Sequence, residues 1–260
     1  MRANRLIGKI VVPLLATALL AAAQGGGRGP AGPPPPPKEI APIDITGYWV
    51  SIVNEDWRWR MVTPPKGDFA SIPLNAEGRK MGNEWDAAND EAAGAQCKAY
   101  GAAGLMRLPT RLHITWADDN TVKVETDAGE QTRVFHFDAS KTNGGAPTIQ
   151  GDSVASWQKQ RQQRGFGPPL GGVRAGGGGA LKVVTTNMSA GYLRKNGVPY
   201  SNQAVLTEYF DRVEYKGVSY LILTSVLDDP RYLADTFITS EQFKREADGS
   251  KWNPQNCKIK

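Results

Sequence analysis

The sequence is poor in the residues that bind metals. Among its 260 residues there are two histidines, His113 and His136, and two cysteines, Cys97 and Cys257. These numbers exclude a zinc site built from several histidines, and the chain has neither an HExxH nor a CxxC spacing. It also lacks the Gly-x-Ser-x-Gly elbow of serine hydrolases and the Gly-Lys-Ser/Thr ending of a P-loop. The sequence therefore predicts no bound metal and no cofactor.

The chain also lacks a strong charge of either sign. It carries 31 Lys and Arg against 26 Asp and Glu, which gives a formal charge of +5. Three of these cations, Arg2, Arg5 and Lys9, lie at the N-terminus, and without them 28 basic residues face 26 acidic ones. Because nucleic-acid-binding domains are strongly basic, we expect no nucleic-acid partner.

No apolar run is long enough to span a bilayer, which takes roughly 20 residues as a helix. The apolar run from Ile10 to Ala23 follows the basic start, and it ends in three alanines just before Gln24. This order is typical of a secretory signal peptide over residues 1–23, with a retained membrane anchor as the less favoured alternative. We expect a periplasmic or secreted protein with no stable membrane anchor after cleavage.

Export changes the interpretation of the two cysteines. The periplasm and the cell exterior are oxidising, so we expect a disulfide between Cys97 and Cys257 that joins the C-terminal tail to the body of the protein. Residues 24–39 are rich in glycine and proline and include five consecutive prolines, which favours an extended tether. The folded domain is expected to span residues 40–260.

With 29 Gly and 18 Pro, the chain is an unfavourable sequence for an all-α fold. Ten segments instead show period-two alternation or enrichment in β-branched and aromatic residues. They are residues 45–53, 57–62, 111–116, 121–126, 132–137, 153–158, 181–186, 204–213, 219–227 and 238–244. Such strands predict a barrel or a sandwich, and we expect an all-β fold, a single antiparallel β-barrel of eight to ten strands.

One accessory helix is expected to interrupt this pattern. Asn75 is a suitable N-cap for a helix over residues 76–93. Met81 and Trp85 lie on one apolar stripe of that helix. We expect the helix to pack outside the barrel or across one of its ends.

A glycine-rich stretch covers residues 164–180 and contains eight glycines and two prolines. It leads into the predicted strand 181–186 rather than into a helix, so it does not have the form of a phosphate-binding loop. It is either a surface excursion or a mobile lid over a cavity mouth.

Strand parity sorts the two histidines and places one aromatic residue. If the apolar side chains of segment 111–116, Trp116 among them, face inward, the same parity puts His136 inside the barrel and His113 outside. An inward His136 is either an imidazole that binds a ligand or acts as a base, or a core histidine satisfied by a neighbour.

Glu208 is the carboxylate that falls on an apolar strand face, between Leu206 and Phe210. A buried carboxylate needs a partner. One alternative is an ion pair with Arg212 or Arg133, and the other is a general acid or base with a raised pKa.

The first predicted strand contains Gly47 and Trp49, and Lys244 and Arg245 lie at the end of the last one. This Gly-x-Trp with a late basic residue resembles the lipocalins and the wider calycin barrels, in which the tryptophan closes one end and an arginine packs across its indole. A guanidinium gains cation–π energy over an indole while it stays partly hydrated. The resemblance implies structural roles for Gly47, Trp49 and Arg245.

Five further stretches carry a longer resemblance: residues 112–119, 125–129, 191–201, 228–233 and 248–257. They resemble a family of exported bacterial proteins of unknown function with a lipocalin-like fold. The resemblance implies a lipocalin-like fold and carries over no catalytic residue. The block 192–201 includes Tyr192 and Tyr200, and in it a glycine and a proline flank basic and hydroxyl side chains. It is either a rim loop that contacts a ligand or a structural turn.

From these features we expect an exported lipocalin-like protein that binds a small, mainly apolar molecule in a barrel cavity. The expected ligand-binding residues are Trp116, His136, Tyr192, Tyr200 and Glu208. One alternative is an enzyme on the same barrel, an isomerase, cyclase or hydrolase that uses His136 and Glu208 as its catalytic residues. A further alternative is an envelope interaction module with a filled barrel.

Overall fold

The structure, a computed structural model, describes residues 33–142, 144–158 and 179–259. Everything described below belongs to one compact unit, Pro35–Lys260.

Three predicted segments fall wholly or mostly outside the described residues. They are the signal peptide (1–23), the tether (24–39) and the glycine-rich loop (164–180). Among the helices that are described, none has the length and apolar character needed to cross a membrane.

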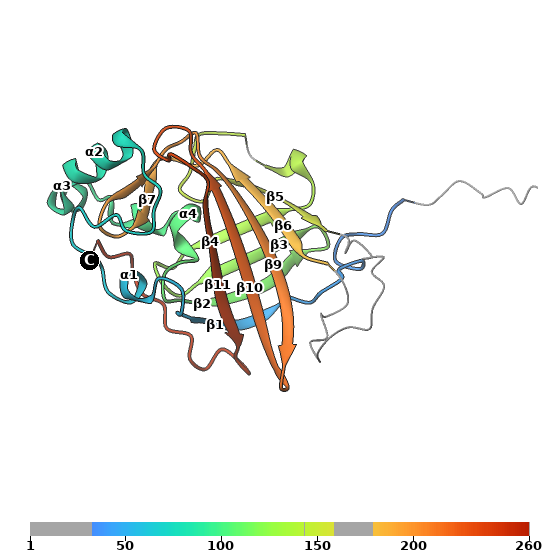
Figure 1. The fold of residues 1–260 in the computed structure, drawn as a ribbon. Coiled ribbons are helices and arrows are strands. Elements are labelled where there is room, and N and C mark those ends of the chain that lie inside the picture. The colour runs from blue at the N-terminus through green and yellow to red at the C-terminus, as the bar shows by residue number, and fades with distance from the viewer. Residues whose placement is uncertain (1–32, 143, 159–178, 260) are drawn as a thin grey trace, which may run out of the picture. The chain divides into compact units, whose positions relative to one another are not determined.

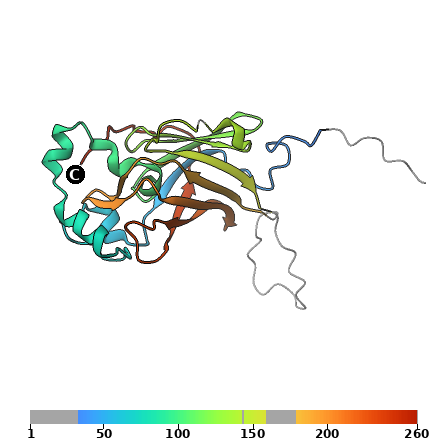
Figure 2. The same ribbon diagram turned by 90° about the horizontal axis from the view of Figure 1, so that it is seen from above.

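Nine strands close into a barrel (Figure 1, Figure 2). They are β1 (Gly47–Ile52), β2 (Arg111–Asp118), β3 (Thr121–Thr126), β4 (Thr132–His136), β5 (Asp152–Trp157), β6 (Leu181–Thr186), β9 (Val205–Tyr215), β10 (Val218–Asp228) and β11 (Phe237–Arg245). Around the barrel the order is β1-β11-β10-β9-β6-β5-β4-β3-β2. Only β4 and β5 pair in parallel, because a closed ring with an odd number of strands needs one parallel pair. The expected all-β single barrel is confirmed.

Short helices and a small hairpin gather at one end of the barrel, on the left in Figure 1. They are α1 (Trp57–Met61), α2 (Ala76–Glu84), α3 (Ala87–Ala92), the 3-10 helix η1 (Gln96–Tyr100), α4 (Ala102–Leu105), β7 (Gly191–Arg194) and β8 (Val198–Tyr200). We call this region the helix-covered end. The predicted disulfide is confirmed there, because Cys97 of η1 is bonded to Cys257 of the C-terminal tail, with Cα atoms 5.1 Å apart.

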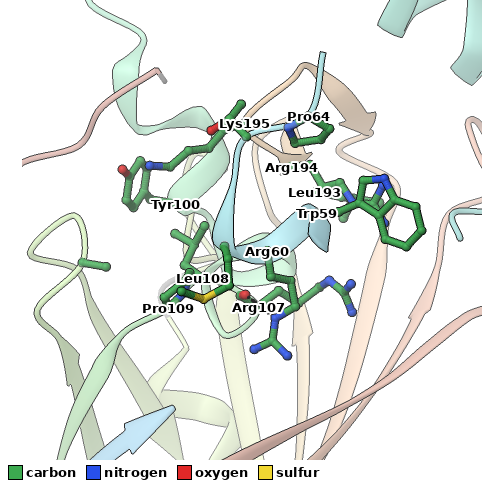
Figure 3. Close-up of a pocket in the computed structure, with 13 residues that line it drawn as sticks. Trp59, Arg60, Pro64, Tyr100, Arg107, Leu108, Pro109, Leu193, Arg194 and Lys195 are labelled. Carbon is green, nitrogen blue, oxygen red and sulfur yellow. Dashed lines mark hydrogen bonds between the residues drawn. The ribbon is translucent and has the colours of Figure 1, made fainter. Parts of the chain in front are cut away.

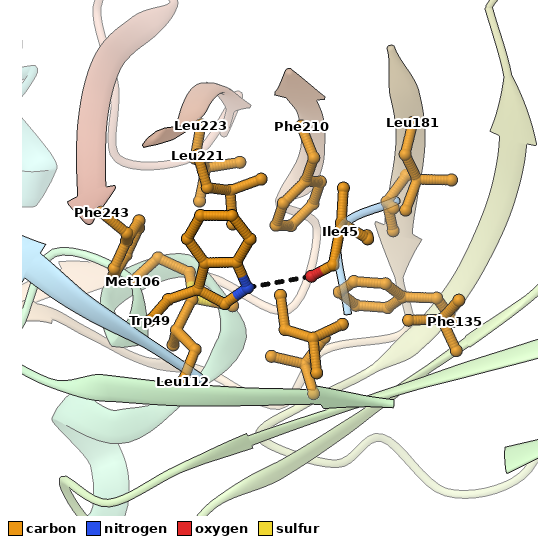
Figure 4. Packing of buried hydrophobic residues seen from close by; sticks show 14 of the residues in the cluster. Ile45, Trp49, Met106, Leu112, Phe135, Leu181, Phe210, Leu221, Leu223 and Phe243 are labelled. Atoms are coloured by element: carbon orange, nitrogen blue, oxygen red, sulfur yellow. Dashed lines mark hydrogen bonds between the residues drawn. The ribbon is translucent and has the colours of Figure 1, made fainter. Parts of the chain in front are cut away.

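Apolar side chains form a buried cluster in the barrel interior. Figure 4 shows apolar residues from opposite walls meeting in the centre, with Trp49 among them. The fully buried members from the strands are Trp49, Leu112, Ile114, Val122, Val124, Phe135, Leu181, Val183, Phe210, Leu221, Leu223 and Phe243. The indole nitrogen of Trp49 donates a hydrogen bond of 2.9 Å to the carbonyl oxygen of Ile45, so this large side chain is buried with its polar atom satisfied.

Arg245 lies over the Trp49 ring, with its guanidinium carbon 5.3 Å from the ring centre. Their backbones are directly paired between β1 and β11. Gly47 makes room for the arginine, because a Cβ atom there would lie 2.9 Å from Nη2 of Arg245 and the residue has a φ of 110°. The stack and the glycine have the arrangement implied by the calycin resemblance.

Two local predictions are wrong. Segment 57–62 was expected as a strand but forms α1, and its apolar residues Trp57 and Val62 are exposed. The helix expected over 76–93 breaks at Trp85, whose backbone is extended, and Asp86 then caps α3. Asn75 does cap α2, as its side chain accepts a hydrogen bond from the amide of Gly78.

The buried face of α2 also differs from the predicted apolar stripe. Met81 is 40% exposed, whereas Gly78 and Gly82 are buried. A Cβ atom at Gly82 would lie 2.7 Å from the Phe69 ring. The backbone of α2 approaches its neighbours closely at these glycines, and large side chains contribute little. A hydrophobic pattern does not reveal this kind of packing.

The predicted parity of β4 is wrong by one residue. Phe135 and Arg133 face the interior, opposite Val122 and Val124 of β3, while Val134 is 37% exposed. His136 therefore lies on the outer face and is only partly buried. The prediction placed the apolar Val134 inward, but Arg133 takes the inward position instead, so every side chain of β4 faces the opposite way.

Candidate functional site

The five predicted ligand-binding residues do not form one site. Trp116 packs against Phe137 and Trp157 inside the barrel wall, with ring centres 5.8 and 6.4 Å away. His136 lies on the other face of the wall, with its Nδ1 atom 3.5 Å from the hydroxyl of Thr121.

Glu208 is fully buried in the barrel and is paired with Arg133. Its two carboxylate oxygens accept hydrogen bonds of 2.8 and 2.6 Å from the guanidinium of Arg133. Thr185 accepts a further bond of 3.2 Å from the same group. This is one of the two alternatives considered for Glu208, the structural ion pair, with Arg133 rather than Arg212 as the partner.

Tyr192 and Tyr200 lie on the β7–β8 hairpin, which the sequence did not predict as strands. Burial and the nearby Asp90 carboxylate raise the pKa of Tyr192, and its ring meets Trp85 edge-on at 6.2 Å. Tyr200 is fully buried, and burial raises its pKa as well. Both tyrosines are therefore neutral, and the buried hydroxyl of Tyr200 has no hydrogen-bond partner among the described residues.

A pocket of about 250 Å³ lies at the helix-covered end (Figure 3). Three chain segments supply most of its lining: α1 with the residues after it, the turn after α4, and β7 with the residue that follows it. Tyr100 of η1 and Ala128, between β3 and β4, complete it. The lining residues are Trp59, Arg60, Met61, Thr63, Pro64, Tyr100, Arg107, Leu108, Pro109, Ala128, Leu193, Arg194 and Lys195. The uncharged part of this lining is apolar or aromatic except for Thr63, and none of these residues is among the five predicted ligand-binding residues.

Every charged residue of the lining is a cation: Arg60, Arg107, Arg194 and Lys195. Arg107 has partners, because its Nη2 atom lies 2.7 Å from Asp56 and its Nη1 atom lies 3.2 Å from Glu241. Burial raises the pKa of Glu241 to about 7 although Arg107 acts in the opposite direction. This carboxylate therefore compensates only part of the positive charge near neutral pH.

Arg60 is held by backbone carbonyl groups. Its Nε atom donates to the carbonyl of Arg107 at 2.7 Å, a bond drawn in Figure 3, and its Nη1 atom donates to that of Glu55 at 3.3 Å. Its buried Nη2 atom has no hydrogen-bond partner among the described residues. Burial lowers the pKa of Arg60.

Arg194 is the least satisfied of the pocket cations. Its side chain is 4% exposed, and its guanidinium carbon lies 5.4 Å from the ring centre of Trp59. Within the part of the chain that the structure describes, Nε, Nη1 and Nη2 all lack a hydrogen-bond partner. The charged contact is with Asp56, 3.5 Å from Nη2. Burial and then repulsion from Arg107 lower the pKa of Arg194 to about 10.

Two sequence signals could have indicated this pocket. The run Trp57-Arg58-Trp59-Arg60 concentrates residues that are common in binding sites, but its alternation was interpreted as a strand. Arg194 and Lys195 lie within the block 192–201, which was considered as a ligand-contacting rim because a glycine and a proline flank its basic and hydroxyl side chains. Neither signal reveals that the two segments meet.

The chain matches no protein-family description, and comparisons with curated proteins and with solved structures find no match. Among the described residues, no group of three His, Cys, Asp or Glu side chains is placed to hold a metal ion.

Proposed function

We propose that this protein is an exported, lipocalin-like binding protein that takes a small ligand with a substantial apolar part. We place the ligand in the pocket between α1, the turn after α4, and β7, rather than in the centre of the barrel. The observation that carries the proposal is that pocket, since ligand sites are concave, mainly apolar and furnished with a few polar groups.

The surroundings of the pocket support a ligand with an apolar body. A second hollow of about 630 Å³ shares Thr63 and Pro64 with the pocket, so a ligand could extend from one into the other. Beside them, Trp57, Met61 and Val62 are large apolar residues that are more than half exposed. An exposed apolar cluster next to a pocket is suited to cover a ligand.

Export and membership of the lipocalin-like family are part of the same proposal. The basic start with its apolar run and the disulfide between Cys97 and Cys257 support an oxidising compartment. The closed barrel and the stack of Arg245 on Trp49 support the family resemblance. The barrel departs from lipocalins in its strand number, because those have eight strands.

The enzymatic alternative on His136 and Glu208 has no support in the geometry. The carboxylate of Glu208 is buried and engaged by Arg133, while His136 lies on the outer face of β4. The two groups cannot approach the same substrate atom. The alternative of an interaction module is supported by the exposed side chains of Trp57 and Val62.

Titration with the neutral fluorescent probe N-phenyl-1-naphthylamine tests the proposed function. We expect saturable binding to the mature protein and its loss in Thr63→Trp, which puts an indole into the pocket. Thr142→Trp, at a partly exposed threonine outside the pocket lining, is the matched control and should bind as the wild type does. Equal binding by both variants would place the probe elsewhere and contradict the proposed site.

A further inference from the structure

We infer that the pocket recognises an oxyanion, a carboxylate, sulfonate or phosphate carried by the ligand, through Arg194 and Arg60. The inference deepens the proposed function and rests on it, because it names the chemical class of the ligand for the same pocket. It predicts an amphipathic acid as the ligand, with its charged group among the arginines and its apolar part on Trp59 and Leu193.

Unused donors carry the inference. Four buried guanidinium nitrogens around the pocket, three of Arg194 and one of Arg60, have no hydrogen-bond partner among the described residues. Buried polar groups are normally paired, and each exception calls for an explanation. A ligand oxyanion supplies the missing acceptors, because the planar fork of a guanidinium matches the two oxygens of a carboxylate or phosphate.

The nearby carboxylates do not satisfy these donors. Asp56 is shared, because its Oδ2 atom accepts from Arg107 at 2.7 Å and lies 3.5 Å from Arg194. Asp68 lies close enough to influence Arg194, but its carboxylate accepts from the indole nitrogen of Trp59 at 2.9 Å. Glu241 is paired with Arg107, and no acidic residue belongs to the pocket lining.

The remaining charged groups around the pocket also favour an anionic ligand. Lys195 is a fourth cation of the lining, and its ammonium nitrogen lies 5.0 Å from the ring centre of Tyr100. Glu55 is directed away, since its carboxylate accepts from the amide of Ser240 at 2.7 Å. Four cations therefore face a pocket without an acidic wall, which favours an anion over a neutral or cationic ligand.

Burial makes a purely structural role for Arg194 costly. A guanidinium that loses its hydration and gains no hydrogen bond is destabilising, and the contact with Trp59 returns only part of that loss. In the barrel, the same chain buries Arg133 with a carboxylate that binds it through both oxygens. A charge left without such a partner is explained by a ligand that provides one.

Two probes with the same aromatic skeleton test the inference on the mature protein. The first is 8-anilinonaphthalene-1-sulfonate and the second is N-phenyl-1-naphthylamine, which lacks the sulfonate. We expect the sulfonate to bind about tenfold more tightly, as a charged hydrogen bond allows. Benzoate and inorganic phosphate should displace it, whereas benzamide should not.

Arg194→Met should bring the two affinities within about twofold of each other, because it removes the charge and keeps the apolar stem. Arg231→Met, at an exposed arginine paired with Glu77 and absent from the pocket lining, should keep the wild-type preference. In the wild-type protein, phosphate should also shift the Nε–H resonance of Arg194 in NMR spectra. This measurement uses only the wild-type protein, so it does not require that a variant folds.

The outcomes separate the inference from the proposed function. If both probes bind equally and Thr63→Trp blocks both, the ligand pocket stands and anion recognition is overturned. If Thr63→Trp blocks neither probe, the pocket itself is not the binding site, and the proposed function fails with the inference. A sulfonate preference that survives in Arg194→Met would also overturn the role assigned to Arg194.

Discussion

Arg133 and Arg194 are both almost completely buried, but their surroundings differ. Arg133 lies in the barrel interior and donates to both oxygens of Glu208 and to Thr185. Arg194 lies at the helix-covered end and stacks on Trp59, and its guanidinium has no hydrogen-bond partner in the described part of the chain. The first arrangement neutralises the guanidinium charge within the fold. The second leaves the guanidinium donors without acceptors.

The two regions also differ in how their space is used. The barrel interior is packed with apolar side chains around Trp49, whereas the helix-covered end contains a pocket of about 250 Å³. The pocket that we propose as the binding site is built by short elements added to one end of the barrel. A closely packed interior is a rigid support for such elements.

The largest expected effect lies in the barrel interior. Trp49→Ala should cost about 3 to 5 kcal/mol, because a fully buried indole is replaced by a void. Arg245→Ala should cost roughly 1 to 2 kcal/mol through lost stacking and stem packing. Because the two residues touch, the double variant should lose less than the sum of the single losses in urea unfolding. Strict additivity would show that the stack does not couple them.

Glu208→Gln tests the charge that the barrel neutralises. It should cost about 3 kcal/mol, because Arg133 stays buried without its counter-charge while glutamine keeps one acceptor. Glu214→Gln on the same strand is the control, since Glu214 pairs with Arg212 at the surface and should change stability little. Equal losses for the two variants in urea unfolding would remove the distinction between buried and exposed pairs.

Glu241 lies where the two regions meet, paired with Arg107 and almost fully buried. Its folded-state pKa of about 7 exceeds the ordinary value of 4.5, so the fold favours the protonated form. The stabilisation is complete below pH 4.5 and is lost as the pH rises toward 7. Between pH 5 and pH 7.5, wild-type unfolding free energy should fall by about 2 kcal/mol more than that of Glu241→Gln. Parallel pH profiles would contradict the raised pKa.

Arg194→Met should have the smallest effect and the opposite sign. Without ligand, it should stabilise the protein by about 1 kcal/mol, because it removes a buried charge that lacks hydrogen bonds. Arg133→Met should instead destabilise, because it leaves Glu208 unpaired in the barrel. Thermal unfolding of the two variants compares the two regions directly. A loss of stability in Arg194→Met would show that Asp56 and Trp59 suffice as its partners.

Much of the barrel could be predicted from the sequence, because period-two alternation reports a strand with one buried face. Nine of the ten predicted segments overlap barrel strands. The tenth, 57–62, alternates tryptophan and arginine as a strand would, yet it is a helix of five residues. A helix this short does not complete enough turns for its own periodicity to show.

The site was less predictable, because its residues meet through contacts distant in sequence. Trp59 and Arg194 are 135 positions apart, and the pocket exists only where α1, the turn after α4 and β7 converge. The error at His136 has a similar origin. Arg133 takes the inward position because Glu208, 75 residues away, is there to accept its hydrogen bonds.

By itself, the sequence determined the strand-rich fold class, the positions of most strands, the pairing of the two cysteines and the pattern around Trp49. These features follow from local alternation, from the presence of only two cysteines and from a short motif. Only the tertiary structure decided which face of β4 is buried, where a buried guanidinium lacks hydrogen-bond acceptors among the described residues and which segments enclose a pocket. Such properties depend on the neighbours that folding brings together, and a buried charge is stabilised or left free according to those neighbours alone.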